Sequence, residues 1–200
     1  MILTHVWGLF SHPDREWEAI GAEPCTIGNC YLRHVLVLAA LPAVSALIGS
    51  TQVGWQIGVG SAIKLSVPSA LIIAAVFYVA MLVAVVTMGE FIHWMANTYD
   101  AETSIERCVV LSAYTATPLF LAGVLTLYPL LWLNMLVGLL ALAYTIYLLY
   151  IGVPIVMRVP SEQGYLFSSS ILTVGMVMLV GLMAVTIVLW SSGGATALGS

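Results

Sequence analysis

The fold is decided by residues 109–157, which read VVLSAYTATPLFLAGVLTLYPLLWLNMLVGLLALAYTIYLLYIGVPIVM. This run of 49 residues contains no charged side chain and no histidine. As a helix with a rise of about 1.5 Å per residue, it is long enough to cross a hydrocarbon layer of about 30 Å twice. Tyr128 and Pro129 stand in its middle, where we expect the chain to reverse. The run therefore predicts a hairpin of two transmembrane helices.

The rest of the chain has the same character. Hydrophobic residues make up 62% of its 200 residues and charged residues 7%, well below the roughly 25% charged residues of ordinary soluble domains. Pro42 interrupts the first apolar stretch, but a proline is tolerated in a membrane helix when neighbours take up the freed carbonyl. We predict an all-α integral membrane protein with five transmembrane helices, at residues 32–49, 69–95, 109–127, 130–152 and 171–190.

Basic residues indicate how these helices are oriented. Only Lys64 falls on the side opposite to the N-terminus, and four residues fall on the N-terminal side, namely Arg15, Arg33, Arg107 and Arg158. Because short loops rich in Lys and Arg remain in the cytoplasm, this asymmetry predicts a cytoplasmic N-terminus. Five crossings then place the C-terminus outside. We expect a cytoplasmic segment at residues 1–31, a membrane domain at residues 32–190 and a short flexible tail at residues 191–200.

The cytoplasmic segment carries the signals of a short amphipathic helix. Ser11 offers a capping hydroxyl, Pro13 suits the first helical turn, and Asp14 complements the positive helix end. We predict a helix that runs to about Ile20, with Trp17 and Ile20 on one face. Two interpretations are open: this face packs on the membrane surface, or it binds a partner protein.

Polar residues cluster inside the third predicted span. Pro118 cannot donate a hydrogen bond to the carbonyl of Tyr114, so one acceptor is left unpaired and a kink is expected. The hydroxyl of Thr115 or Thr117 is a candidate to fill the gap. We interpret the cluster as a structural kink packed against the fourth span, with a substrate site as the alternative.

One tyrosine of the fourth span lies well inside the membrane. Tyr144 is about 9 Å deeper along the helix than Tyr150, which is itself expected in the aromatic belt at the membrane boundary. A phenolic hydroxyl at that depth needs an internal hydrogen-bond partner. The sequence does not indicate which residue supplies it.

Glu90 and His93 near the end of the second span are the ionisable residues that come closest to the membrane interior. They are three residues apart on one helical face, a spacing that carboxylate-bridged metal bundles use twice and that occurs once here. We therefore expect no metal at this pair. Two interpretations remain: a hydrated pair at the membrane boundary with Arg107 as counter-charge, or part of a proton or ion pathway.

Other classes of site find little support in the sequence. Cys25, Cys30 and His34 are residue types that zinc accepts, but the set lacks a fourth ligand, so we expect no metal and no other cofactor. We find no nucleophile paired with a base and expect no enzyme activity. The net charge of -4 is spread over short loops and gives no reason to expect nucleic-acid binding.

Three segments carry a resemblance to a known family. They are residues 5–16 (HVWGLFSHPDRE), residues 114–121 (YTATPLFL), and residues 147–152 (YLLYIG), which end at Gly152. Pro13, Trp17 and Ile20 also fit a Pro-x-x-x-aromatic-x-x-Ile pattern. Together they resemble the Yip (Ypt-interacting protein) family, and within it a short bacterial inner-membrane branch. The resemblance implies five spans in the inner membrane, a cytoplasmic N-terminus and a periplasmic C-terminus, without catalytic residues.

The resemblance also bears on partners. Eukaryotic members imply binding of prenylated Ypt/Rab GTPases and of other Yip proteins, but a bacterial host supplies no such GTPase, so we do not expect a Rab-type partner. Our first hypothesis is a non-enzymatic membrane scaffold or adaptor that acts in the lipid bilayer through helix packing, as a homo-oligomer or with other membrane proteins. The alternative is a small ion or solute transporter or channel that uses Glu90, His93 and the polar third span.

Overall fold

The computed structural model describes residues 2–22, 34–55, 64–98 and 103–198. These residues are almost entirely helical, which confirms the all-α prediction. Cys25 and Cys30, two of the three zinc-type residues considered above, lie outside the described residues.

Eight α-helices and two short helical segments follow one another along the described chain. They are α1 (Ile2–Ser11), α2 (Pro13–Ala22), α4 (Leu36–Ile48), the π-helical turn η2 (Gly49–Val53), α5 (Val67–Thr98), α6 (Ile105–Thr115), α7 (Thr117–Ala122), the 3-10 segment η3 (Gly123–Leu127), α8 (Leu131–Met157) and α9 (Ser161–Leu198). Five stretches are long and apolar enough to cross a membrane, as predicted: Leu36–Val53, Val67–Thr98, Ile105–Leu127, Leu131–Met157 and Ser161–Val188.

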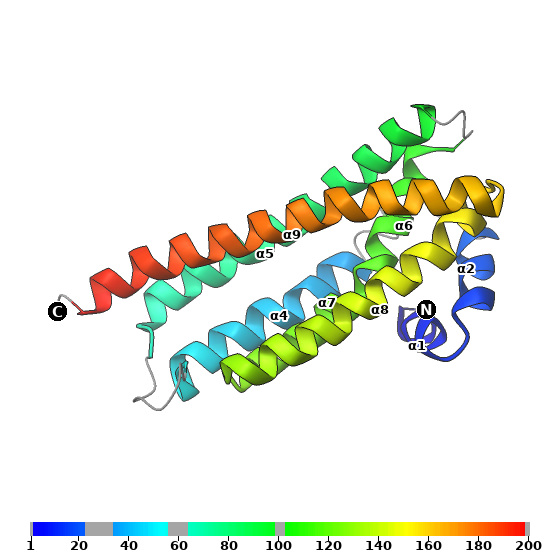
Figure 1. The fold of residues 1–200 in the computed structure, drawn as a ribbon. Helices are drawn as coiled ribbons and strands as arrows, with labels where there is room; N and C mark the ends of the chain where they lie inside the picture. The colour runs from blue at the N-terminus through cyan, green and yellow to red at the C-terminus, as the bar shows by residue number, and fades with distance from the viewer. Residues whose placement is uncertain (1, 23–33, 56–63, 99–102, 199–200) are drawn as a thin grey trace.

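The helices form an elongated bundle (Figure 1). The two longest helices, α5 and α9, lie side by side, and α4, α7 and α8 form a second group that α6 joins to them. Helices α1 and α2 cover one end of the bundle, and the C-terminus lies at the opposite end. Ends on opposite sides are what an odd number of crossings requires.

The third span is broken where the sequence predicted a kink. Helix α6 ends at Thr115, and α7 begins at Thr117 with Pro118 in its first turn. The carbonyl of Ala116 accepts the amides of Leu119 and Phe120 at 3.1 and 3.2 Å, which starts the second helix without an amide from the proline. The break packs against α8, as expected, and α6 also packs against α5.

Glycines allow the helices to approach closely. A Cβ atom placed on Gly89 of α5 would lie 2.8 Å from the Cα atom of Val109 in α6, and one placed on Gly123 of η3 would overlap Pro42 of α4. Side chains any larger than hydrogen would push these pairs apart. Close backbone approach at small residues is the usual way in which membrane helices associate.

The chain differs from the sequence predictions at both ends. The N-terminal segment holds two helices, α1 and α2, where we predicted one. Residues 191–198 of the predicted tail are helical, because α9 continues to Leu198. No proline follows Ser191 in this helix, so nothing in the residue sequence interrupts the backbone hydrogen bonds.

Candidate functional site

Helices α1 and α2 form a hairpin that docks on the bundle. The amide of His12 donates to Gly8 O at 2.8 Å and the amide of Glu16 to His12 O at 3.1 Å, so the turn between the helices is tight. On α2, the predicted apolar face is confirmed, since Trp17 is 0% and Ile20 4% exposed. This face packs mainly against α8 of the same chain. It therefore does not rest on the membrane surface, which was one of the two interpretations.

Trp17 lies against a glycine of the fourth span. A Cβ atom on Gly152 would lie 2.7 Å from Cε2 of Trp17 and 3.0 Å from Cδ1 of Leu111. All three residues belong to the closely packed interior at this end of the bundle. Gly152 therefore leaves the room that the indole ring occupies. Trp17 and Gly152 therefore contact each other, although they are 135 positions apart and the sequence analysis named them separately.

Tyr144 has the internal partner that its depth requires. Its hydroxyl donates to Leu9 O at 2.9 Å, and its ring stacks on Phe10 with centroids 5.0 Å apart and planes 4° apart. In a helix, Leu9 O would accept the amide of residue 13, but that residue is Pro13 and has no amide hydrogen. The tyrosine hydroxyl thus replaces a hydrogen bond that the turn of the hairpin removes.

A second buried contact lies at the break between α6 and α7. His34 is 1% exposed, and its Nε2 atom is 3.0 Å from Thr117 Oγ1. The ring of Tyr114 lies 4.1 Å from the ring of His34 and meets the ring of His5 edge to face at 5.8 Å. The hydroxyl of Thr117 is thus engaged with His34 from the segment before α4. Thr115 Oγ1 is buried without a hydrogen-bond partner among the described residues, so neither threonine confirms the predicted repair of the kink.

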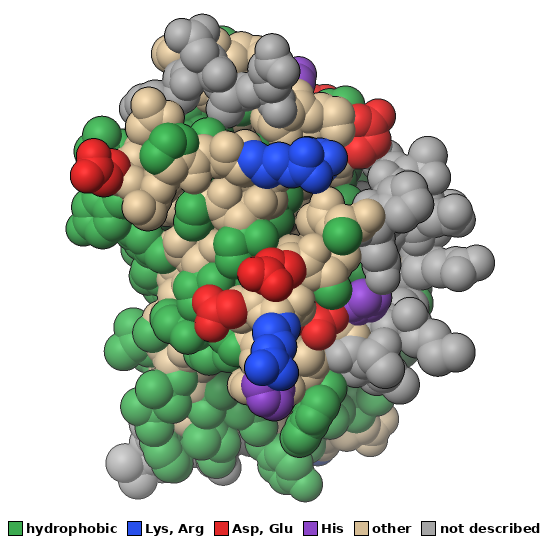
Figure 2. All heavy atoms as spheres, turned by 90° about the vertical axis from the view of Figure 1, so that its right-hand side faces the viewer, with side chains coloured by type: hydrophobic (Ala, Val, Ile, Leu, Met, Phe, Trp, Pro, Cys, Tyr) green, Lys and Arg blue, Asp and Glu red, His purple; other side chains and the backbone are tan. Residues whose placement is uncertain are grey.

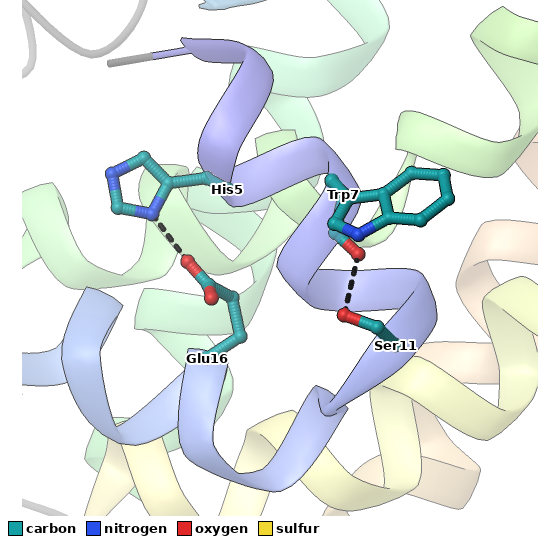
Figure 3. Close-up of polar contacts among 4 residues, drawn as sticks. All are labelled: His5, Trp7, Ser11 and Glu16. Atoms are coloured by element: carbon teal, nitrogen blue, oxygen red, sulfur yellow. Dashed lines mark hydrogen bonds and ion pairs between the residues drawn. The ribbon is translucent and has the colours of Figure 1, made fainter.

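A hydrogen bond between side chains connects the two helices of the hairpin. His5 Nδ1 of α1 lies 2.5 Å from Glu16 Oε1 of α2, and both side chains are mostly buried. Figure 3 shows His5 and Glu16 facing each other between the helices, while Trp7 extends on the other side of α1. There Ser11 Oγ donates to Trp7 O at 3.0 Å.

The Glu90 and His93 pair does not join this site. Glu90 is exposed and makes no hydrogen bond or ion pair with any residue in the described ranges. His93 Nδ1 lies 4.0 Å from Cys108 Sγ, a contact that involves neither Glu90 nor Arg107. The expectation that Arg107 serves as counter-charge to Glu90 is therefore wrong for the described structure. Within the described ranges, no three His, Cys, Asp or Glu residues are placed to hold a metal ion.

Charged residues gather at the end that carries the hairpin. Figure 2 views this end and shows Arg, Asp and Glu side chains on it, with hydrophobic side chains around them. Of the charged residues that the structure describes, only Lys64 belongs to the other end, before α5. Lys64 and the other described charged residues thus lie at opposite ends of the bundle, as the prediction of orientation requires. The structure does not show which side of a membrane each end faces.

We call Leu111, Tyr114, Tyr144 and Gly152 the hairpin-docking site, because each contacts or packs with α1 or α2. Sequence reasoning found three of these residues and Trp17 on the hairpin, but it missed four hairpin residues that contact the bundle or join α1 to α2. The missed residues are His5, Leu9, Phe10 and Glu16. A signal was present for helix α1, since residues 2–10 are apolar and uncharged apart from Thr4 and His5. Nothing in the residue spacing indicated that this helix would contact the fourth span.

The arrangement offers buried apolar and aromatic surface, with single hydrogen bonds between elements, and no reactive pair of side chains among the described residues. Comparisons with known proteins agree with the resemblance drawn from the sequence. A family model described as the Yip1 domain matches residues 7–183. Two relatives, both named inner membrane protein YohC, come from Escherichia coli strain K12 and from an O6:H1 strain of Escherichia coli. Each is 49% identical over 191 residues, covering 96% of this chain and 98% of the relative.

No solved structure matches the chain. The family match begins at Trp7 in α1 and ends at Met183 in α9, so it includes most of the hairpin, its docking site, four of the five long apolar helices and most of the fifth. The chain belongs to the Yip1 domain family.

Proposed function

We propose that the chain is a non-enzymatic scaffold or adaptor of the bacterial inner membrane, with its N-terminus in the cytoplasm, that acts through helix packing and self-association. The inner-membrane location rests on the names of the two relatives and on the five apolar helices. The orientation rests on the basic residues. Of the four basic residues that the structure describes, three lie at the hairpin end, and the fourth, Lys64, lies at the other end.

The observation that carries the proposal is how the polar residues of the third and fourth spans are used. Tyr144 donates to Leu9, and Thr117 pairs with His34. Tyr114 lies between the rings of His5 and His34. A transport pathway needs polar side chains that face water inside the membrane. Here Tyr144 and Tyr114 contact the N-terminal hairpin and Thr117 pairs with the segment before α4, so each joins parts of the chain to one another, which favours a structural role.

A groove on α5 and α9 supplies a surface for association. Every side chain that lines it is apolar except Thr87, and three are alanines: Ala75, Val76, Val79, Ala80, Val83, Ala84, Thr87 and Met178. Small side chains let the backbone of another helix approach closely in lipid. A helix from a second copy of the chain fits this description.

Crosslinking in native membranes and mass measurement in mild detergent test the proposal. We expect an oligomer that Ala80→Leu with Ala84→Leu converts to a smaller species, because the larger side chains fill the groove. Ala143→Leu on the exposed face of α8 adds the same volume outside the groove and should leave the oligomer unchanged. A chain that is monomeric and crosslinks to no other protein would contradict the proposal.

Flux measurements address the transporter alternative directly. Purified protein in sealed vesicles is expected to give no proton or cation flux above that of empty vesicles. Any flux above that of empty vesicles would overturn the scaffold proposal in favour of transport. If Glu90→Gln abolishes this flux, the Glu90 carboxylate takes part in transport, and if the flux persists, transport uses other residues.

A further inference from the structure

We propose that helix α1 lies inside the lipid bilayer, with the side chains of Trp7 and Phe10 against acyl chains, while α2 lies at the water boundary above it. The N-terminal hairpin is then a membrane-embedded element, in the leaflet on its own side of the bundle. This inference does not depend on the scaffold role.

Helix α8 sets the depth of α1. Its 27 residues carry no charge, so it is about 40 Å long, against about 30 Å for the hydrocarbon layer. Tyr144 is the middle residue of α8, about 20 Å from either end. Wherever the hydrocarbon layer lies along α8, Tyr144 is about 10 Å or more from each of its surfaces. Leu9 and Phe10 contact Tyr144 and therefore share this depth.

The composition of the two hairpin helices agrees with different surroundings. Helix α1 contains no acidic or basic residue other than His5, which is paired with Glu16. Helix α2 exposes the charged side chains of Asp14, Arg15 and Glu18. A carboxylate or guanidinium is unfavourable in hydrocarbon, whereas exposed charges are solvated at the boundary. Trp17 of α2 packs at Gly152, eight residues closer to the charged end of α8 than Tyr144.

Three carbonyls near the C-terminal end of α1 have protein donors. The last carbonyls of a helix have no partner within it and usually bind water. In α1, Gly8 O accepts the amide of His12, and Leu9 O accepts the hydroxyl of Tyr144. Ser11 Oγ donates to Trp7 O. Protein donors at these positions remove the need for water, which is absent from the hydrocarbon layer.

An exposed aromatic surface connects α1 to the lipid-facing side of α8. Phe10 is 43% exposed and stacks on Tyr144, whose ring lies 5.6 Å from that of Tyr147, itself 48% exposed. Trp7 is 75% exposed on α1. The outer surface of α8 faces acyl chains in any transmembrane arrangement. The exposed aromatic surface of α1 continues this surface at the same depth, so it faces acyl chains too.

Tryptophan fluorescence in reconstituted vesicles tests this placement. The full chain and its Trp7→Phe variant are placed in phosphatidylcholine and phosphatidylglycerol vesicles, and the difference between their spectra gives the emission of Trp7. We expect phosphatidylcholine brominated on its acyl chains to remove most of this emission. We expect aqueous acrylamide to leave it nearly unchanged.

A reporter on α2 is the matched control. Glu18→Trp in the Trp7→Phe background places an indole on the exposed face of α2, and its emission should respond to acrylamide more than to brominated lipid. Quenching of Trp7 by acrylamide and not by brominated lipid would place α1 in water and overturn the inference. Protection of Trp7 from both quenchers would overturn it as well, because protein would then cover the residue.

Discussion

The third and fifth spans are both apolar helices, yet they occupy opposite environments. In the third span (Ile105–Leu127) 61% of the most apolar window is buried inside the protein, and in the fifth (Ser161–Val188) 6% is. Their hydroxyl groups differ in the same sense. Ser112 of the third span donates to Val85 O of α5 at 3.0 Å, whereas Thr173 and Thr186 of the fifth donate to carbonyls of their own helix.

The hydrogen-bond partner of a hydroxyl group indicates whether its helix faces lipid or the protein interior. A hydroxyl that bonds its own helix four residues back needs nothing from a neighbour, so its helix can face lipid. A hydroxyl that bonds another element fixes its helix in the interior. By this criterion the third span is the centre of the molecule. The third and fourth spans pack against each other, and the N-terminal hairpin docks on the buried surface that these two spans form.

The largest effect should come from removing the indole that docks the hairpin on this buried face. Trp17→Ala is expected to destabilise the docked hairpin by about 3–5 kcal/mol, the range for removing a large buried aromatic side chain. Limited proteolysis of the N-terminal segment in detergent would measure the loss. Trp94→Ala removes an indole that is 64% exposed and should change little. Equal effects of the two would mean that the hairpin is not held at Gly152.

Filling the space beside that indole should have the next largest effect. Gly152→Leu forces a side chain against Trp17 and Leu111 and is expected to lower the free energy of unfolding by up to about 3 kcal/mol, the range for overpacking. Gly181→Leu in the fifth span enters open space and should be neutral or stabilising. Thermal unfolding of both variants compares the two spans directly, and a loss in Gly181→Leu alone would reverse the comparison.

A hydroxyl in each span gives a finer test. Thr117→Val removes the partner of buried His34 and should cost about 1–2 kcal/mol, because the imidazole is left unpaired. Thr186→Val in the fifth span should cost almost nothing. The double change Thr117→Val with His34→Leu should recover part of the loss, since both polar partners are then absent. Unfolding midpoints of these three variants and of His34→Leu alone decide this, and additive losses would exclude the contact.

The smallest effect concerns the hydroxyl of Tyr144. Tyr144→Phe keeps the ring stacked on Phe10 and removes only the hydrogen bond to Leu9 O, so we expect a loss of about 0.5–1.5 kcal/mol. Tyr165→Phe in the fifth span, at a ring that is 63% exposed, is the control and should be neutral. Hydrogen exchange of the amides in α1 is the sensitive measurement, and unchanged exchange would argue that Leu9 O finds another donor.

The elements that could be predicted are those set by short stretches of sequence. The absence of charge in residues 109–157 predicts two membrane-spanning stretches, and Tyr128 with Pro129 predicts the reversal between them. The structure confirms both, since η3 ends at Leu127 and α8 begins at Leu131. Pro118 gave the kink, because the missing amide acts within one turn. The aromatic and small positions Trp17, Tyr144 and Gly152 were also found, but as separate features.

The parts that were missed depend on contacts between distant segments. The spacing of Glu90 and His93 puts both on one helical face, yet in the structure Glu90 is exposed and His93 contacts Cys108. His34 is a residue type that binds zinc, but its ring pairs with Thr117, 83 residues away. No residue spacing along the chain carries that information.

Residue types along the chain are enough to predict five apolar helices, the places where they bend or reverse, and the end at which charges collect. Which helix is interior, and that the N-terminal hairpin packs on the fourth span, depends on contacts in three dimensions. Hydropathy is a property of each residue, whereas lipid and a neighbouring helix solvate an apolar side chain almost equally. Which of the two a helix face meets is therefore decided by the fit of glycines, rings and single hydrogen bonds between segments.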